Sequence, residues 1–315
     1  MRLGVVGTSW ITDSFLEAIK DIPDITLVSV TSPRKESTER FIKKYGFLEG
    51  YNDYNQMIYS TKVDLLYIAS PNSFHFLQTK KALSCGINVL CEKPITLSEL
   101  ELDILKNIAV LNNVYFIEAM RPVHHPHTQF LKESLNKLDS IKYANLKFMR
   151  YSSKYDAYKQ GLNPRVFTKD FGGGALNDLG VYPITLAVLL FGAPKEVKKH
   201  SLMLNTGVDA TTSVILQYED FICTCSFSKI SNSYSYNEIQ GEANTILLSH
   251  VTHLDKMILK DDEKEEVLLD KQIDDDMKYE MKAIMNIIKN NDKQEFDRLF
   301  NITKTVTRIC DKIRK

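Results

Sequence analysis

The sequence has no excess of charge and no long apolar stretch. Its 40 lysines and arginines balance its 40 aspartates and glutamates. Balanced charge argues against binding nucleic acid through the overall charge, so we expect no nucleic-acid partner. The longest apolar run, residues 184–193, is about half a membrane span. Residues 1–7 (MRLGVVG) lack the regions of a secretory signal. We therefore expect no membrane association.

Cysteine is also scarce, which excludes two further classes. Five cysteines in 315 residues are an odd number, and no two have CxxC spacing. A disulfide framework and a structural zinc site are therefore not expected. We expect reduced thiols and a cytoplasmic location. The five residues are Cys85, Cys91, Cys223, Cys225 and Cys310.

The first 120 residues alternate short apolar runs with helical patterns. The expected strands are residues 1–6, 25–31, 63–69, 87–91 and 114–118. The expected helices are residues 10–20, 36–45, 73–84 and 97–111. This alternation predicts βαβ units, hence an α/β fold with a doubly wound parallel sheet of the Rossmann type.

Near residue 120 the pattern changes. After a long strand (141–150) and a buried helix (175–191), runs of alternating residues follow one another without helices between them. These predict an α+β domain with a large, mostly antiparallel open sheet. The predicted domains are residues 1–120 and residues 121–315. The last helices are able to pack back on the first domain. The further expected strands are residues 196–205, 210–218, 221–230, 235–240 and 245–249.

The turn after the first strand reads Gly7-Thr8-Ser9-Trp10-Ile11-Thr12. A dinucleotide-binding loop prefers G-x-G-x-x-G/A, because glycines allow a tight turn and close approach to the pyrophosphate. Only the first glycine is kept here. Two interpretations stay open: a plain strand-to-helix turn, or a cofactor loop. Its place at the start of the βαβ array favours a cofactor loop made by residues 7–11.

The end of the second strand carries no acidic residue. An acid about 20 residues past the glycine loop would bind the ribose 2′-hydroxyl of NAD. The sequence instead has Thr31-Ser32-Pro33-Arg34-Lys35. A hydroxyl and cations suit a 2′-phosphate, which a guanidinium can bind through two hydrogen bonds. We therefore predict NADP(H) over NAD(H), bound by Ser32 and Arg34. The alternative is a solvated basic loop.

Four segments together resemble one known family. They are LGVVGT (3–8), IASPNSFH (68–75), CEKP (91–94) and GGGALNDLGVYP (172–183). The chain closely resembles the glucose–fructose oxidoreductase / inositol dehydrogenase / MocA (Gfo/Idh/MocA) family over its whole length. The tyrosine form of the last motif resembles the branch with dimeric dihydrodiol dehydrogenase.

The resemblance implies roles for particular residues. Tyr182 is expected to transfer the proton, and Lys93 to contact the nicotinamide ribose and the substrate. A neighbouring ammonium lowers a phenol's pKa, so Lys93 would help Tyr182 act near neutral pH. Asp178, four residues before Tyr182, would orient the pair or a substrate hydroxyl. The expected cofactor-binding residues are Gly7, Thr8, Ser9, Trp10, Ile11, Ser32, Arg34, Ser70, Pro71, Asn72, His75, Glu92, Lys93, Pro94 and Arg121.

Each assignment has a simpler alternative. Lys93 would then be a surface lysine, Tyr182 a packed aromatic and Asp178 a locally paired acid. Arg121 would form a salt bridge. The cluster His124, His125 and His127 matches no zinc spacing, so we predict no metal and a polar loop.

The expected function is hydride transfer between a nicotinamide and a carbinol or carbonyl carbon of a sugar, polyol or dihydrodiol. A small molecule is thus the expected substrate. The alternative is a catalytically inactive NADP(H)-binding regulator. A methyltransferase is disfavoured by the Glu-Lys-Pro segment and the antiparallel second domain. A homodimer or homotetramer through the C-terminal sheet is expected, with Val214, Leu216 and Tyr218 on the pairing face.

Overall fold

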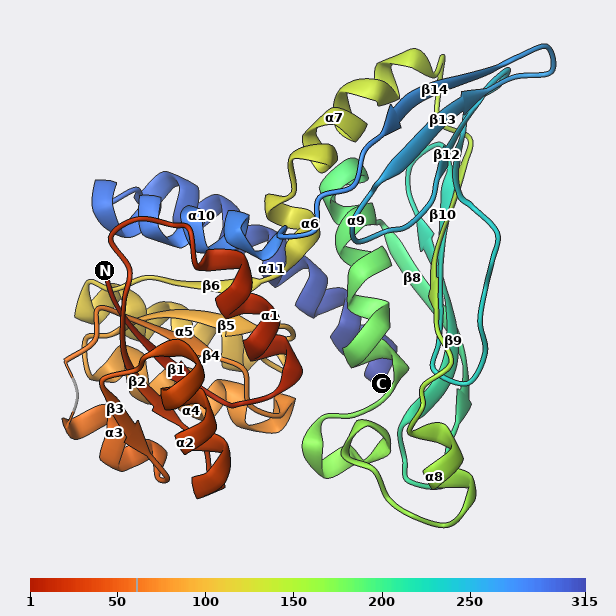
Figure 1. Ribbon diagram of the computed structural model, residues 1–315. Coiled ribbons are helices and arrows are strands. Elements are labelled where there is room, and N and C mark those ends of the chain that lie inside the picture. Colours follow the sequence, from red (N-terminus) through yellow and green to blue (C-terminus); the bar gives the residue numbers. More distant parts are fainter. Residues whose placement is uncertain (61) are drawn as a thin grey trace. The chain divides into compact units, whose positions relative to one another are not determined.

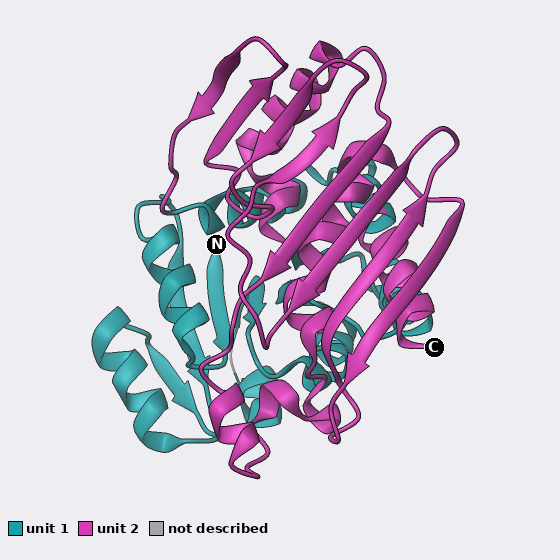
Figure 2. Ribbon diagram, turned by 90° about the vertical axis from the view of Figure 1, so that its right-hand side faces the viewer, with its two compact units in different colours: residues 1–119, 275–301 teal, residues 120–274, 302–315 magenta. Residues whose placement is uncertain are grey.

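The computed structural model describes residues 1–60 and 62–315. The chain divides into two compact units (Figure 2). Unit 1 contains residues 1–119 and 275–301, and unit 2 contains residues 120–274 and 302–315. The predicted domains, 1–120 and 121–315, therefore differ from the two units mainly in the helical segment 275–301.

Unit 1 is built on a six-stranded parallel sheet in the order β3-β2-β1-β4-β5-β6. This order, with crossovers on both sides of β1, is the predicted doubly wound α/β fold and confirms it. The short strand β3 was not predicted. The strands are β1 (Arg2–Val6), β2 (Thr26–Thr31), β3 (Glu49–Tyr51), β4 (Leu65–Ile68), β5 (Asn88–Glu92) and β6 (Phe116–Ala119).

Helices cover both faces of this sheet (Figure 1). On β4, the neighbours Leu66 and Tyr67 point to opposite faces. Phe15 stacks on Tyr67 at a centroid distance of 3.7 Å, whereas Met57 lies beside Leu66 next to Gly4. Burial on both faces explains why β4 is apolar throughout. The helices are α1 (Trp10–Ile19), α2 (Lys35–Tyr45), α3 (Tyr54–Ser60), α4 (Asn72–Ser84), α5 (Glu99–Asn112), α10 (Met277–Asn290) and the start of α11 (Lys293–Arg314).

Unit 2 contains an eight-stranded sheet in the order β14-β13-β12-β11-β7-β10-β9-β8. Its neighbours are antiparallel except β7 and β10, which are parallel. The mostly antiparallel sheet is thus confirmed, although β13 and β14 were not predicted. The strands are β7 (Tyr143–Met149), β8 (Glu196–Met203), β9 (Asp209–Gln217), β10 (Ile222–Ser228), β11 (Asn237–Gln240), β12 (Thr245–Leu248), β13 (Lys256–Lys260) and β14 (Glu265–Asp270).

One face of this sheet packs on the predicted buried helix, which has two parts. A π-helical turn, η4 (Leu176–Gly180), leads into α9 (Val181–Phe191). Lys169–Phe191 is the one described segment long and apolar enough to cross a membrane, and 72% of its most apolar window is buried within the protein. Such burial is typical of a core helix. The remaining helices are α6 (Arg121–His124), α7 (Pro126–Ser134), η1 (Leu135–Lys137), α8 (Tyr155–Lys159), η2 (Arg165–Phe167) and η3 (Lys169–Phe171).

The alternation along β9 separates the two faces of the sheet. Val214 and Leu216 are fully buried, Tyr218 is 6% exposed, and all three belong to the core of unit 2. The expectation that they form a pairing face is therefore wrong, because the core already covers them. The opposite face carries Ile215, which is 38% exposed. Figure 2 shows that face of the sheet without a covering helix from the described part of unit 2.

Candidate functional site

The glycine loop of unit 1 can be built only with glycine at its first position. Gly7 has a φ of +102°, and its N–H donates to the Thr31 carbonyl over 2.9 Å. A Cβ at this position would lie 2.5 Å from the Ala69 carbonyl oxygen. Gly7 therefore joins the carboxyl ends of β2 and β4, the edge where α/β sheets bind their ligands.

Ser9 and Thr12, which stand where the motif has its second and third glycines, have different surroundings. Ser9 is the extended residue before α1, and its side chain makes no capping hydrogen bond to the helix. The first amides of α1 are therefore left to other acceptors, such as a pyrophosphate. Thr12 is fully buried, whereas Trp10 is 74% exposed. Thr8 is also buried and Ile11 half-buried.

The end of β2 provides the predicted hydroxyl and cation. Ser32 is buried, and its Oγ accepts a hydrogen bond from the backbone N–H of Arg34 over 3.4 Å. Arg34 is exposed. The neighbouring Lys35 lies 3.8 Å from Glu39 in an exposed ion pair. Ser32 and Arg34 thus flank the turn that leads into α2.

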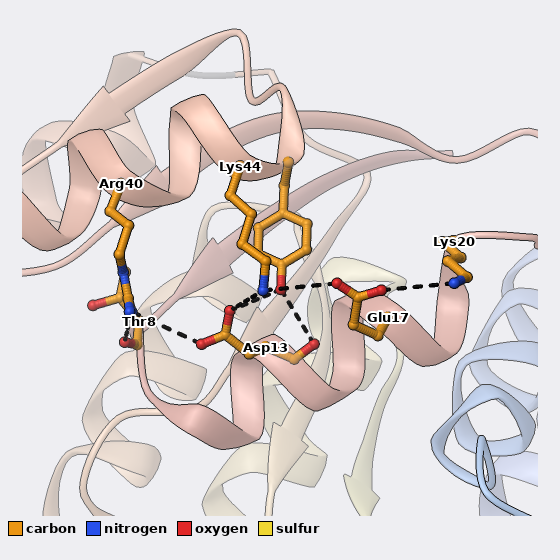
Figure 3. A network of polar contacts seen from close by, with 7 residues as sticks. Thr8, Asp13, Glu17, Lys20, Arg40 and Lys44 are labelled. Carbon is orange, nitrogen blue, oxygen red and sulfur yellow. Dashed lines mark hydrogen bonds and ion pairs between the residues drawn. The ribbon is translucent and has the colours of Figure 1, made fainter.

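A further cation near the loop was missed by the sequence reasoning. Arg40, on α2, donates to the Thr8 carbonyl over 3.3 Å. Figure 3 shows Arg40 and Lys44 reaching from α2 towards Asp13 on α1. Lys44 is 2.9 Å from Asp13, and Arg40 is 3.8 Å from it. Nothing in the local sequence identified Arg40, because its role depends on how α2 packs against α1.

The segments after β4 and β5 are tied together by His75. Its Nδ1 lies 2.9 Å from the Pro94 carbonyl oxygen, and its Nε2 lies 2.7 Å from the Ser70 carbonyl oxygen. His75 is 1% exposed, and burial lowers its pKa. The predicted cofactor residue His75 therefore supports the backbone beside Lys93 instead of facing solvent.

Lys93 itself follows β5 and precedes a cis peptide bond to Pro94. The residue before it, Glu92, is buried and accepts a hydrogen bond from the Tyr67 hydroxyl over 2.8 Å. On the other side of Pro94, the amide of Ile95 donates a hydrogen bond to the Glu118 carboxylate over 3.0 Å. Lys93 is therefore half-buried within a backbone that its neighbours hold on both sides. Pro71 and Asn72 form the start of α4.

In unit 2, the three glycines before η4 permit close backbone contacts. A Cβ on Gly173 would lie 2.6 Å from the Val166 carbonyl, and one on Gly174 would lie 2.5 Å from Asp209. Asp209 accepts a hydrogen bond from the Leu176 amide over 2.9 Å and another from Thr212. Burial raises the pKa of Asp209. This carboxyl therefore fixes the beginning of the helix that carries Asp178 and Tyr182.

Asp178 and Tyr182 extend from this helix. Asp178 lies in the π-helical turn and pairs with Lys229, which the sequence reasoning missed. The Tyr182 ring packs 5.6 Å from Phe148 and is half-buried. Arg121, at the start of α6, is half-buried as well. Lys93 belongs to unit 1, whereas these residues belong to unit 2.

The histidine-rich segment has the surroundings of a packed turn. His125 is 2% exposed, and its Nδ1 accepts a hydrogen bond from the His127 amide. Within residues 1–60 and 62–315, no group of three His, Cys, Asp or Glu side chains is arranged to hold a metal ion.

Comparison with known proteins identifies both halves of the chain. Residues 1–119 match the family model described as "Oxidoreductase family, NAD-binding Rossmann fold", and residues 137–247 match the "GFO/IDH/MocA C-terminal domain". The chain belongs to the Gfo/Idh/MocA family. It is therefore an NAD(P)-binding oxidoreductase.

The relatives of this family member include named dehydrogenases. It is 35% identical to scyllo-inositol 2-dehydrogenase (NADP(+)) IolU of Bacillus subtilis, over 100% of this chain and 96% of that protein. It is 28% identical to trans-1,2-dihydrobenzene-1,2-diol dehydrogenase of Xenopus tropicalis, over 69% and 65% of the two chains.

Solved structures share the fold. KijD10, a 3-ketoreductase from Actinomadura kijaniata solved with NADP and TDP-benzene, aligns with a TM-score of 0.85 and 21% identity, over 98% of this chain and 96% of that one. UDP-N-acetylglucosamine 3-dehydrogenase GnnA from Acidithiobacillus ferrooxidans aligns with a TM-score of 0.81 and 18% identity, over 100% and 96%.

Proposed function

We propose that this chain uses NADP(H) to interconvert a secondary alcohol and a ketone on a polyol or sugar. The observation that carries the proposal is the 35% identity to an NADP-dependent scyllo-inositol dehydrogenase along the whole chain. The dihydrodiol dehydrogenase relatives and the UDP-N-acetylglucosamine 3-dehydrogenase of the same fold support the broader chemistry, a carbinol carbon in a hydroxylated small molecule.

The cofactor fits the residues of unit 1. Gly7 leaves space beside the backbone that a Cβ would fill, so a ligand can approach the backbone closely there. The first turn of α1 is not capped by the Ser9 side chain. In this proposal Gly7, Thr8, Ser9, Trp10 and Ile11 contact the pyrophosphate and its ribose. The segments Ser70–Asn72 and Glu92–Pro94, with Arg121, border the nicotinamide end.

The preference for NADP(H) rests on the end of β2. Ser32 and Arg34 stand where NAD-specific proteins have an acid, and Arg40 adds a guanidinium at the Thr8 carbonyl. A guanidinium binds a phosphate dianion through charge-assisted hydrogen bonds, which a 2′-hydroxyl cannot match.

The chemical step divides between cofactor and protein. NADP⁺, when bound, accepts the hydride from the carbinol carbon. Tyr182 removes the hydroxyl proton, and Lys93 stabilises the negative charge on the phenolate and on the substrate oxygen. Asp178 accepts a hydrogen bond from a neighbouring hydroxyl and so orients the substrate. In ketone reduction the proton returns from Tyr182 to the oxygen.

The first experiment measures cofactor binding through Trp10, the single tryptophan. Its exposed position in the glycine loop makes its emission sensitive to a bound reduced nicotinamide. We expect saturable quenching that favours NADPH over NADH. Arg34→Ala should weaken NADPH binding without affecting NADH, whereas Lys35→Ala, which removes a cation already paired with Glu39, should change little. Equal affinity for both cofactors would refute the NADP(H) preference.

Turnover is then measured with scyllo-inositol and other polyols and NADP⁺, by the absorbance of NADPH. Tyr182→Phe and Lys93→Ala should each reduce kcat by about 100-fold or more while cofactor quenching persists. Wild-type turnover in both variants would refute the assigned roles. Quenching without turnover of any polyol, sugar or dihydrodiol would refute the substrate class.

We also propose that the protein forms a homodimer or homotetramer in the cytoplasm. The open face of the unit 2 sheet exposes Ile215 and Ile222, at 38% and 37%, between polar neighbours. All five cysteines are free thiols and four are buried, as suits a reducing compartment. A monomer at micromolar concentration by light scattering would refute the oligomer, and Ile215→Lys should dissociate it.

A further inference from the structure

Lys229 lies where the alternation of β10 calls for an apolar side chain. Cys223, Cys225 and Phe227 on this strand are fully buried. Lys229 comes two residues after Phe227, just past the end of the strand, and therefore continues the same face. Its side chain is only 7% exposed. A lysine in such a place needs an ionic partner, because an unpaired buried charge is strongly unfavourable.

The partner is Asp178 in the π-helical turn. The Lys229 ammonium donates a hydrogen bond to Oδ2 of Asp178, and the ring of Phe167 lies 6.0 Å away. In the described chain, Asp178 is the only side chain that accepts a hydrogen bond from this ammonium. The Asp178 side chain is 37% exposed. The cation is therefore enclosed, while the carboxylate remains the accessible member of the pair.

The pair is held by rigid backbone on both sides. The Lys229 amide donates to the Ala210 carbonyl over 2.9 Å, and its carbonyl accepts from the Ser152 amide over 2.9 Å. On the other side, a Cβ at Gly180 would lie 2.7 Å from the ring of Phe227. The glycine thus brings the π-helical turn down onto β10, next to the lysine. This explains in physical terms why the Asp178 motif contains a glycine two residues later.

We propose that Lys229 is a positioning residue for Asp178, an inference that rests on the proposed function. Its ammonium holds the carboxylate in one orientation. A carboxylate can accept several hydrogen bonds, so the oxygens of Asp178 present a fixed acceptor to a substrate hydroxyl beside the reacting carbon. Lys229 acts through Asp178 and does not touch the reacting atoms.

The test compares Lys229→Met, Lys229→Arg, Asp178→Asn and the double variant Lys229→Met/Asp178→Asn. The assay uses NADP⁺ with scyllo-inositol, or with whichever polyol the wild-type protein turns over fastest. We expect Lys229→Met to reduce kcat/KM about tenfold or more, while NADPH affinity measured through Trp10 stays within about twofold of wild type. Lys229→Arg should recover most of the activity, because it restores the cation. The double variant should be no slower than Asp178→Asn, since Lys229 acts only through that carboxylate.

Lys256→Met is the matched control. Lys256 also belongs to unit 2 and pairs with an aspartate, Asp270, but both side chains are at the surface. This variant should behave as wild type. If Lys229→Met is too unstable to assay, the arginine variant and the neutral double variant, which strands no charge, still test the coupling.

Three results would overturn the inference. They are normal kcat/KM in folded Lys229→Met, additive losses in the double variant, and no recovery with arginine. Failure of the proposed function is distinguishable, because wild type itself would then turn over no polyol. In that case the catalytic role of Lys229 is refuted together with the proposed function. The unfolding free energies of the four variants still measure the coupling between Lys229 and Asp178 without substrate.

Discussion

Replacing His75 with alanine should separate the two segments that it joins. The imidazole lies between the Ser70 carbonyl after β4 and the Pro94 carbonyl after β5. A neutral ring donates one hydrogen bond, so its loss leaves one buried carbonyl without a donor, at a cost of about 1–3 kcal/mol. Loss of the buried ring adds about 2 kcal/mol of packing. The expected loss of unfolding free energy is therefore about 3–5 kcal/mol, measured by urea denaturation.

The kinetic consequence follows from the position of Lys93, which is bonded to Pro94. Without the ring that packs between the two segments, Lys93 is less well placed, and a displacement of about 1 Å can reduce turnover up to about 100-fold. We expect kcat to fall between about 10-fold and 100-fold, with weaker NADPH binding because the segment after β4 packs against the same ring.

His127→Ala provides the control. His127 is also a buried histidine, 6% exposed, but its Nδ1 makes no hydrogen bond to any described residue. Its replacement should cost only the packing term and leave kcat unchanged. Folded His75→Ala with wild-type turnover and NADPH affinity would refute the reasoning.

Three further predictions concern stability and assembly of the site. Gly7→Ala should abolish NADPH binding and lower the unfolding free energy by about 3 kcal/mol, because its Cβ would overlap Ala69. The control Gly46→Ala, at a φ of +76° but in open space, should lower the unfolding free energy by only about 1 kcal/mol. Equal losses in the two variants would contradict this. Burial lowers the pKa of His250 to about 4, so its contribution is complete above pH 6.5 and is lost as the pH falls towards 4. Acidification from pH 7 to pH 5 should cost about 2 kcal/mol, measured by urea denaturation and absent in His250→Gln. Asp209→Asn should lower kcat several-fold with unchanged NADPH quenching, because the start of η4 loosens; unchanged kcat would show that Asp209 is not needed there.

The periodicity of the first 120 residues predicted the parallel sheet, because strands such as Leu65–Ile68 are covered on both faces and read as apolar runs. The short strand β3 and the short helix α3 were not predicted. Their three and seven residues are too few to show a hydrophobic period. In unit 2, β14 was missed for a different reason. Glu265 and Glu266 interrupt the apolar pattern in a strand that is mostly exposed.

Some candidate site residues could be chosen from the sequence, because their residue type has few other uses at its position. Gly7, Ser32 and the Glu-Lys-Pro segment belong to this kind. His75 and Lys229 were harder, because their roles depend on which chain segments meet. Lys229 did leave a signal: in FICTCSFSKI it falls in phase with Cys223, Cys225 and Phe227. A charged residue at a buried register position of a strand indicates a partner, although the sequence does not name it.

The path of the chain between the two units limits how the protein can be divided. It passes from unit 1 to unit 2 after Ala119, returns at Asp275 and leaves again within α11, after Asn301. In unit 1, Phe296 packs edge-on against Tyr115 and Phe116 at centroid distances of 5.2 Å and 5.4 Å. A fragment ending at residue 119 would therefore expose these rings to water and aggregate readily. A minimal cofactor-binding module requires residues 275–301 joined to residue 119 through a new linker, and deleting the C-terminal helix damages both units at once.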